Sequence, residues 1–379
     1  NDPLANINRL ASEAQDAFRQ LCDYCVPFTE ITELENSEEA QLFSRVLRLY
    51  IEKIRKNNWL DSSMLANHLL QYDPEQWLNS KDDKSLSLIG FYDPNPEVKA
   101  VLFKSHGYKA FESPEKLIAA CDVIDIVTPT LFHYDMAMLA LNAKKHVFIE
   151  KPIATSDNEA KTIVAVANKN GIIGMVGHVE RFNPAFKAVS KSITEPKFIE
   201  THRLAEFNPR GTDVSVVLDL MIHDIDIILS VVKSPIKNIE ASGVAVISET
   251  PDISNARIEF ENGCVANLTA SRISLKKMRK SRFFQKNAYI SVDFLDKKVE
   301  VVKIKNAPKE SNDFSLLLSN AEGKKKQIYF ENPEIIERNA IQDELEHFAE
   351  AIKMKKNPNI SLKDGAKALE VAHKIISCI

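Results

Sequence analysis

The sequence predicts an α/β chain in which a Rossmann-like, doubly wound parallel sheet precedes an α+β domain with a mostly antiparallel sheet. Two observations carry this prediction. Between residues 85 and 177, short apolar runs alternate regularly with stretches of helical period. From residue 198 onward, most strand-like runs follow one another directly. Alternation favours parallel strands joined by helices, whereas consecutive strands favour antiparallel pairing.

Three parts are expected along the chain, with boundaries at residues 1–84, 85–177 and 178–379. The first part contains no glycine, and its apolar residues recur at helical spacing, so it is expected to form an extra helical segment. Its Cys22-Asp23-Tyr24-Cys25 stretch is not followed by a second pair of ligands. Ordinary helix packing is therefore favoured for it, with a metal or redox role as the alternative, and no metal site is expected.

Bulk composition excludes several classes of partner. The chain has 379 residues, 44% of them hydrophobic, and a net charge of −4, which gives no general attraction to nucleic acid. No apolar run approaches the ~20 residues that span a bilayer, and the first residues lack the pattern of a secretory signal. The five scattered cysteines are typical of reduced thiols. A cytoplasmic protein without membrane or nucleic-acid partners is expected.

The elements of the parallel part have clear local boundaries. Two of its helices end before a glycine, at Gly107 and Gly171, as helices often do. We expect strands over residues 85–91, 108–111, 123–127, 147–149 and 172–176, and helices over residues 97–106, 114–120, 133–143 and 156–170.

The elements of the last part are mainly strands. Glu261-Asn262-Gly263 is typical of a hairpin turn between two of them. We expect strands over residues 198–207, 236–247, 256–260, 265–272, 288–294, 298–304 and 326–330, and helices over residues 214–232, 335–352 and 364–376.

Candidate site residues lie where the parallel strands end. Thr128-Pro129-Thr130 and Glu150-Lys151-Pro152 each follow such a strand directly, and ligands bind at the carboxyl ends of parallel strands. Proline restricts the backbone beside Lys151, which favours a lysine held in one place. Asp93 also follows an expected strand. It either binds the ribose hydroxyls of NAD or simply forms a turn before Pro94, and the residues alone leave both open.

A second candidate pair lies on the expected helix over residues 214–232. Asp219 and His223 are four residues apart, which places them on one helical face. A carboxylate beside an imidazole can orient it as a general base. The alternative is a structural pair within the helix.

These motifs together resemble one family. Thr128-Pro129-Thr130 with His133, Glu150-Lys151-Pro152, and Asp219 with His223 are similar to the Gfo/Idh/MocA (glucose-fructose oxidoreductase / inositol dehydrogenase) oxidoreductases, over about residues 86–379. Within that family, the stretches 177–184, 217–224, 263–272 and 278–280 look most like UDP-N-acetylglucosamine 3-dehydrogenases. The resemblance implies NAD(P)-dependent hydride transfer from a secondary alcohol of a sugar, such as C3 of the sugar in UDP-N-acetylglucosamine.

The resemblance also implies roles for individual residues. Lys151 would lie beside the nicotinamide and the reacting hydroxyl, His223 would remove the hydroxyl proton, and Asp219 would orient His223 or the sugar. Residues 85–177 would bind the cofactor, NAD, and residues 178–379 would bind the sugar and form a homo-oligomer through the exposed face of the 236–330 sheet. The implied cofactor-binding residues are Asp93, Thr128, Pro129, His133, Glu150 and Lys151, and the implied substrate-binding residues are Arg181, Asn183, Arg279 and Lys280.

Arg279 and Lys280 belong to a basic run, which also contains Lys276, Lys277 and Arg282. Two or three of these residues on one face could bind the pyrophosphate of a nucleotide sugar. A solvated strand end is the alternative.

The sequence departs from the family at the cofactor phosphates. The family begins with a strand and a G-x-G-x-x-G turn, but the first glycine of this chain is Gly90. A Cβ atom would occupy the space that the pyrophosphate needs, and without that first strand the strands over 86–91 and 123–127 lose their shared neighbour. Three hypotheses follow: a truncated dehydrogenase fused to a foreign helical segment, a helical segment that rebuilds or regulates the site, and a nucleotide-sugar binder without catalysis.

Overall fold

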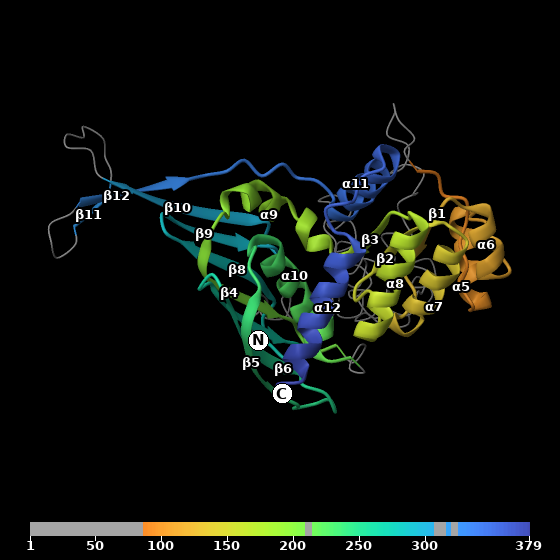
Figure 1. The fold of residues 1–379 in the computed structure, drawn as a ribbon, viewed down its shortest axis with the longest axis horizontal. Coiled ribbons are helices and arrows are strands. Elements are labelled where there is room, and N and C mark those ends of the chain that lie inside the picture. Colours follow the sequence, from red (N-terminus) through yellow and green to blue (C-terminus); the bar gives the residue numbers. More distant parts are fainter. Residues whose placement is uncertain (1–85, 209–213, 307–315, 320–324) are drawn as a thin grey trace, which may run out of the picture. The chain divides into compact units, whose positions relative to one another are not determined.

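The computed structural model describes residues 86–208, 214–306, 316–319 and 325–379 (Figure 1). The chain divides into two compact units, Asn1–Glu112 and Ser113–Ile379. The helices predicted within residues 1–84, and the Cys22–Cys25 pair, lie outside the described residues.

In the first unit, the predicted helix is confirmed as α5 (Pro96–His106). The Asn95 side chain caps it by accepting a hydrogen bond from the Glu97 N–H, and Gly107 ends it with a left-handed φ of 70°. The two strands predicted in this unit are wrong. Residues 86–90 have no regular structure, and Phe91 makes only an isolated parallel bridge with Ala110. Within the described residues, neither segment has further neighbours that would extend the ladder.

The second unit opens with the predicted parallel sheet, which is confirmed. Strands β1 (Val123–Ile126), β2 (His146–Glu150) and β3 (Gly174–Gly177) pair in parallel in the order β1-β2-β3. The helices along this part are α6 (Pro114–Ala120), the 3-10 turn η3 (Thr130–Phe132), α7 (His133–Asn142) and α8 (Asp157–Asn170).

A nine-stranded sheet follows, in the order β11-β12-β10-β9-β8-β4-β7-β6-β5. Only the β4–β7 pair is parallel, which confirms a mostly antiparallel sheet. The strands are β4 (Pro196–Leu204), β5 (Ile236–Val244), β6 (Ile253–Phe260), β7 (Val265–Ser271), β8 (Met278–Gln285), β9 (Ala288–Asp293), β10 (Lys298–Asn306), β11 (Leu316–Ser319) and β12 (Lys325–Glu331).

Sequence reasoning missed β8 and β11. Strand β8 begins with Met278-Arg279-Lys280-Ser281-Arg282, which has little apolar character. It forms because β4 and β9 pair with it on both sides, a tertiary context that outweighs weak local preference.

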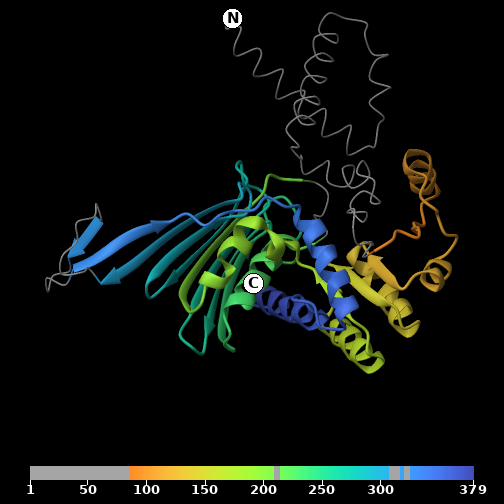
Figure 2. The same ribbon diagram turned by 90° about the horizontal axis from the view of Figure 1, so that it is seen from above.

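Helices cover one face of the large sheet (Figures 1 and 2). Side chains of α9 (Pro184–Val189), α10 (Ile222–Val231) and α12 (Leu362–Ile376) join one buried apolar cluster with β4, β6, β7, β8 and β9. A π-helical turn, η6 (Val217–Met221), precedes α10 directly. The remaining elements are the 3-10 turns η4 (Val179–Phe182) and η5 (Ser190–Ser192), and α11 (Ala340–Met354).

Helix α12 contacts the parallel sheet through Gly365. A Cβ atom at this position would lie 2.4 Å from Cγ2 of Val176 on β3, so only glycine permits the observed approach.

Replacement of Gly365 by alanine is therefore expected to destabilise the protein by about 1–3 kcal/mol, through overpacking against Val176. Helix propensity alone predicts the opposite sign, because alanine is the better helix former by about 1 kcal/mol. Urea unfolding measures the difference. Lys363→Ala, at an exposed position of the same helix, is the control and should change the free energy of unfolding by less than about 0.5 kcal/mol. A stabilised Gly365→Ala variant would contradict the expectation.

Candidate active site

Lys151 follows β2 directly and points its amine at η6. Nζ donates to the backbone carbonyl of Asp219 at 2.9 Å and lies 3.3 Å from Oδ1 of the same residue. The Lys151–Pro152 peptide bond is cis. The side chains of Lys151 and Asp219 keep exposed fractions of 20% and 41%, so a ligand can reach this ion pair.

Asp219 and His223 are close in sequence but do not form a hydrogen-bonded pair. Asp219 lies in the π-helical turn and His223 in α10, and the Asp219 carboxylate bonds to Lys151. The buried Nδ1 atom of His223 has no hydrogen-bond partner among the described residues. Nδ1 of His223 is therefore open to a hydrogen bond with a ligand.

The surroundings of His223 keep its imidazole neutral. Burial lowers the pKa of His223 well below its usual value, because a charged ring loses its hydration. The positive charges of Lys151, Arg203 and Arg279 lower this pKa further. A neutral imidazole at physiological pH can accept a proton.

His133 joins the ends of β1 and β2. Its Nδ1 and Nε2 atoms each lie 2.8 Å from a carbonyl oxygen, that of Pro152 and that of Thr128, respectively. Pro129, between them in the chain, precedes the turn η3. These contacts hold the backbone on both sides of the candidate site, so His133 helps to position Thr128 and Lys151.

Glu150 turns its carboxylate back toward the chain, where Oε2 accepts a hydrogen bond from the Lys151 N–H at 3.1 Å. Burial raises the pKa of Glu150, against the opposing effect of this N–H and of the Lys151 charge. Gly177 on the neighbouring strand β3 leaves room for the Glu150 carboxylate. A Cβ atom at Gly177 would lie 3.1 Å from both carboxylate oxygens.

Several buried polar atoms around these residues lack partners within the described chain. Besides Nδ1 of His223, they include Oγ1 of Thr128, both ring nitrogens of His178, and Oε1 of Glu344 on α11. Burial, followed by the negative charge of Glu150, raises the pKa of Glu344 to about 9, so its carboxyl group is protonated at neutral pH. Unsatisfied buried groups are rare in folded proteins, and their concentration here is typical of a ligand site.

Sequence reasoning missed a buried ion triad next to His223. Arg203 on β4 bonds to Asp224 on α10 through two nitrogens, at 2.9 and 3.1 Å, and to Glu180 of η4 at 2.8 Å. All three residues are buried. The alternation of strand residues could have indicated that Arg203 is buried. In β4, Ile199, Thr201 and Arg203 point to the buried side and alternate with more exposed residues.

The predicted substrate-binding residues Arg181 and Asn183 are engaged inside the protein. The Arg181 guanidinium binds the Asp226 carboxylate, with Nε at 2.6 Å, and also the Asn359 carbonyl. Asn183 caps α9 and donates to the Phe294 carbonyl at 3.0 Å. These contacts favour structural roles for both side chains.

Arg279 and Lys280 are not brought together. Consecutive strand residues face opposite sides of a sheet. Phe283 of β8 lies in the helix-covered core, so Arg279 shares that side, where it lies 3.8 Å from Glu180. Lys280 faces the other side and pairs with Asp293 at 3.3 Å.

Asp93 belongs to the first unit, in the turn before α5. Its Oδ1 atom accepts a hydrogen bond from the Asn95 N–H at 2.7 Å, which is the turn-forming role. This contact leaves its other carboxylate oxygen for a ribose, so ribose binding stays a prediction.

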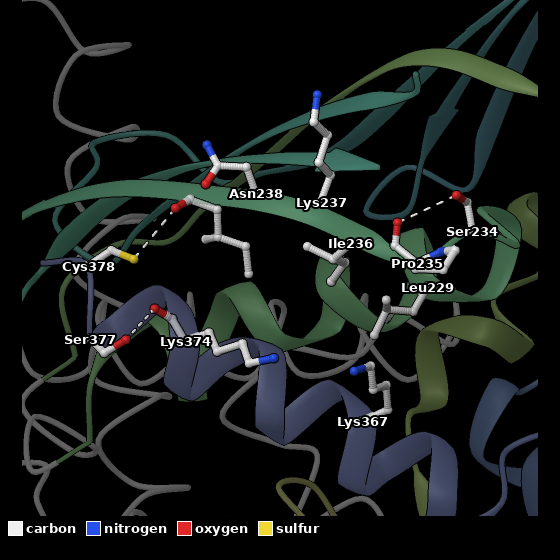
Figure 3. A pocket seen from close by; sticks show the side chains of 11 residues that line it. Leu229, Ser234, Pro235, Ile236, Lys237, Asn238, Lys367, Lys374, Ser377 and Cys378 are labelled. Atoms are coloured by element: carbon white, nitrogen blue, oxygen red, sulfur yellow. Dashed lines mark hydrogen bonds between the residues drawn. The ribbon is translucent and has the colours of Figure 1, made fainter. Parts of the chain in front are cut away.

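A cavity of about 470 Å³ lies between α10, β5 and α12 (Figure 3). Lys367 and Lys374 line it, but both bind Glu370. It contains none of the predicted site residues, and two of its three lysines are already paired. Among the described residues, no cluster of three potential metal ligands is present, and no helix could cross a membrane.

A parallel sheet with candidate residues at its strand ends is typical of a dinucleotide-binding fold, and family comparison identifies the class as oxidoreductases with an NAD-binding Rossmann fold. The family model for that domain matches residues 69–178, and the model for the C-terminal domain matches residues 169–288. The chain belongs to the Gfo/Idh/MocA family of NAD(P)-dependent sugar oxidoreductases.

Individual relatives support the assignment. UDP-N-acetylglucosamine 3-dehydrogenase of Acidithiobacillus ferrooxidans is 35% identical over 215 residues, which cover 56% of this chain and 69% of the relative. Its solved structure matches with a TM-score of 0.70 at 29% identity, over 80% of this chain and 92% of that one. The scyllo-inositol 2-dehydrogenase (NAD(+)) of Bacillus subtilis is 28% identical over 182 residues, 44% of this chain and 52% of the relative. Levoglucosan dehydrogenase, solved with NADH and L-sorbose, shares the fold with a TM-score of 0.64 at 18% identity, over 76% of this chain and 86% of that one.

NAD is the cofactor of this family domain. The residues of this chain suit the nicotinamide end of NAD better than its phosphate end. At the nicotinamide end, the unpartnered Oγ1 atom of Thr128 lies just beyond β1, next to the strand end that carries Lys151. At the phosphate end, residues 69–89 of the matched domain contain no glycine, so the G-x-G-x-x-G turn is absent. The nicotinamide end fits the cofactor, and the phosphate end lacks the usual cradle.

Proposed function

We propose that this protein oxidises a secondary hydroxyl of a nucleotide sugar, with UDP-N-acetylglucosamine oxidised at C3 as the first substrate to test. The observation that carries the proposal is the neutral imidazole of His223, whose buried Nδ1 has no partner among the described residues and whose pKa is lowered by burial and by the nearby charge of Lys151. A base and a cation that both face one polar site suit removal of a hydroxyl proton. The 35% identity to a UDP-N-acetylglucosamine 3-dehydrogenase supports the choice of sugar.

In this mechanism the chain's own residues move and stabilise charge. The unprotonated ring nitrogen of His223 accepts the hydroxyl proton, and the Lys151 ammonium stabilises the negative charge that develops on the sugar oxygen. Asp219 holds the Lys151 amine in place through its carbonyl and carboxylate oxygens. The chemistry that NAD supplies when bound is acceptance of the hydride from the carbon that carries this hydroxyl. We propose Asp93, Thr128, Pro129, His133 and Glu150 as residues of the cofactor side.

Titration with NADH tests the proposal directly, with binding followed by fluorescence or calorimetry. NADH is expected to bind the intact chain, UDP-N-acetylglucosamine is expected to bind to the NADH complex, and NAD⁺ with the sugar nucleotide is expected to yield NADH. If the intact chain binds no NADH, the oxidoreductase proposal fails.

The missing glycine-rich turn favours a second candidate, a nucleotide-sugar binder without catalysis. This candidate predicts UDP-N-acetylglucosamine binding that is independent of NADH. Tight NADH binding would exclude it.

For the oxidoreductase we propose a division of labour in which residues 85–177 bind the cofactor and residues 178–379 bind the sugar. The second candidate would keep the sugar-binding part alone. A homo-oligomer would form through the face of the nine-stranded sheet opposite to α9, α10 and α12, which carries no helix among the described residues (Figure 2). Light scattering measures the oligomeric state.

A further inference from the structure

His178 is the first residue beyond β3, at the same edge of the parallel sheet as Lys151. In the register of β2 and β3, Glu150 lies beside Gly177, so Lys151 and His178 are the next residues of neighbouring strands. A hydrogen bond from the His178 N–H to the Val176 carbonyl, at 2.8 Å, ends the strand there. His178 therefore occupies the ligand-binding edge of the sheet.

The imidazole of His178 is buried, with an exposed fraction of 1%, and both ring nitrogens lack hydrogen-bond partners in the described chain. Burial lowers its pKa, so the ring is neutral and carries one donor and one acceptor. Leaving either group unpaired in the interior costs about 1–3 kcal/mol. A residue with both groups unpaired needs a partner beyond the described residues, and a bound ligand can provide one.

The charged neighbours of His178 are already occupied. Asp226 holds the Arg181 guanidinium, and Asp364 accepts hydrogen bonds from the Ser361 hydroxyl and N–H at the start of α12. The Lys151 amine is bonded to Asp219. The turn η4, which follows His178 directly, packs against α10, the helix that carries the proposed base His223.

We propose that His178 is a substrate-binding residue that holds a second hydroxyl of the sugar, beside the hydroxyl that His223 deprotonates. A sugar hydroxyl can donate or accept, so it can bond to either ring nitrogen of a neutral imidazole, and the other nitrogen stays open to a further polar atom of the ligand. This inference rests on the proposed function. It adds a contact that fixes the orientation of the sugar ring relative to Lys151 and His223.

The test compares three ligands on the wild-type protein, His178→Leu and His178→Gln, by calorimetry. In His178→Leu, the Kd of UDP-N-acetylglucosamine for the NADH complex is expected to rise about tenfold, the cost of one or two neutral hydrogen bonds. The Kd of UDP, which has no sugar ring, and the Kd of NADH are expected to stay within about twofold. Glutamine keeps a donor and an acceptor, so His178→Gln should recover part of the loss.

His146→Leu is the matched control, because His146 starts β2 at the opposite end and bonds to the Ile173 N–H. Its stability should change without a change in sugar affinity. The inference fails if His178→Leu binds UDP-N-acetylglucosamine like the wild type, or if its affinities for all three ligands fall together, as a purely structural role predicts. If only the Kd of NADH rises in His178→Leu, His178 contacts the nicotinamide and not the sugar, and the inference is also overturned. Wild-type protein that binds neither NADH nor UDP-N-acetylglucosamine would instead refute the proposed function, and this inference with it.

Discussion

Replacement of His223 by asparagine is expected to lower kcat for UDP-N-acetylglucosamine oxidation by about 10²- to 10⁴-fold, the usual contribution of a positioned general base. Asparagine keeps a polar side chain near the Lys151–Asp219 pair but cannot accept a proton at neutral pH. The Kd of NADH should change little, because the substitution removes the base and leaves the strand-end residues in place. Stopped-flow absorbance of NADH formation measures kcat.

The pH dependence distinguishes a base from a merely structural histidine. Because the pKa of His223 lies well below the usual 6.5, its ring is neutral throughout pH 6.5–8. Protonation of His223 should therefore lower the wild-type kcat/KM only below pH 6.5. The unfolded chain takes up a proton near pH 6.5 while the folded chain does not, so His223 also weakens folding as the pH falls below 6.5. In His223→Asn both effects should disappear.

Lys374→Met is the control for nonspecific loss, since Lys374 is exposed on α12 and pairs with Glu370. It should retain wild-type kcat. The base assignment is refuted if His223→Asn keeps its kcat within about threefold, or if the acid limb of its pH profile is unchanged while the protein stays folded.

Local signals predicted the elements around this site well, and tertiary contacts decided the rest. Helix α6 begins at Pro114 after a Ser113 cap, and the β1–α7–β2 unit has its expected order, because caps and apolar periodicity act within a few residues. The strand predicted over residues 85–91 failed because a strand also needs neighbours, which no local pattern encodes.

The same distinction applies to the candidate site. Lys151 could be placed from the sequence, since it follows an apolar run and precedes a proline. The partner of Asp219 could not, because the spacing of Asp219 and His223 suggested a mutual contact, whereas the π-helical turn directs Asp219 to Lys151. The open nitrogens of His178 depend on which neighbours are already bonded, information that only the folded chain contains.

Replacement of Arg203 by methionine is expected to destabilise the protein by about 3–5 kcal/mol, the cost of leaving buried charges without their partner. Glu180 and Asp224 both contact the Arg203 guanidinium, and all three side chains are buried. Although burial alone would lower the pKa of Arg203, the two carboxylates raise it, so the guanidinium stays charged. Methionine fills similar volume without charge, and urea unfolding at neutral pH measures the loss.

The sign of the pH effect tests this explanation. Burial raises the pKa of Asp224, and the Arg203 charge opposes that rise. Without Arg203, the pKa of the Asp224 carboxyl in the folded state should rise further. The buried carboxylate then destabilises the fold at high pH, and this cost shrinks as the pH falls and the carboxyl is protonated. The stability deficit of Arg203→Met should therefore be smaller at pH 5 than at pH 8, and urea unfolding at both pH values measures it.

A triple variant, Arg203→Met with Glu180→Gln and Asp224→Asn, should recover part of the lost stability, because no uncompensated charge remains buried. The exposed pair of Lys374 and Glu370 provides the contrast, since Lys374→Met should cost less than about 0.5 kcal/mol. If Arg203→Met costs no more than this surface substitution, the triad does not stabilise the β4–α10 contact. The charge of Arg203 would then act chiefly on His223. Loss of Arg203 should raise the pKa of this proposed base and move the acid limb of the activity profile to higher pH.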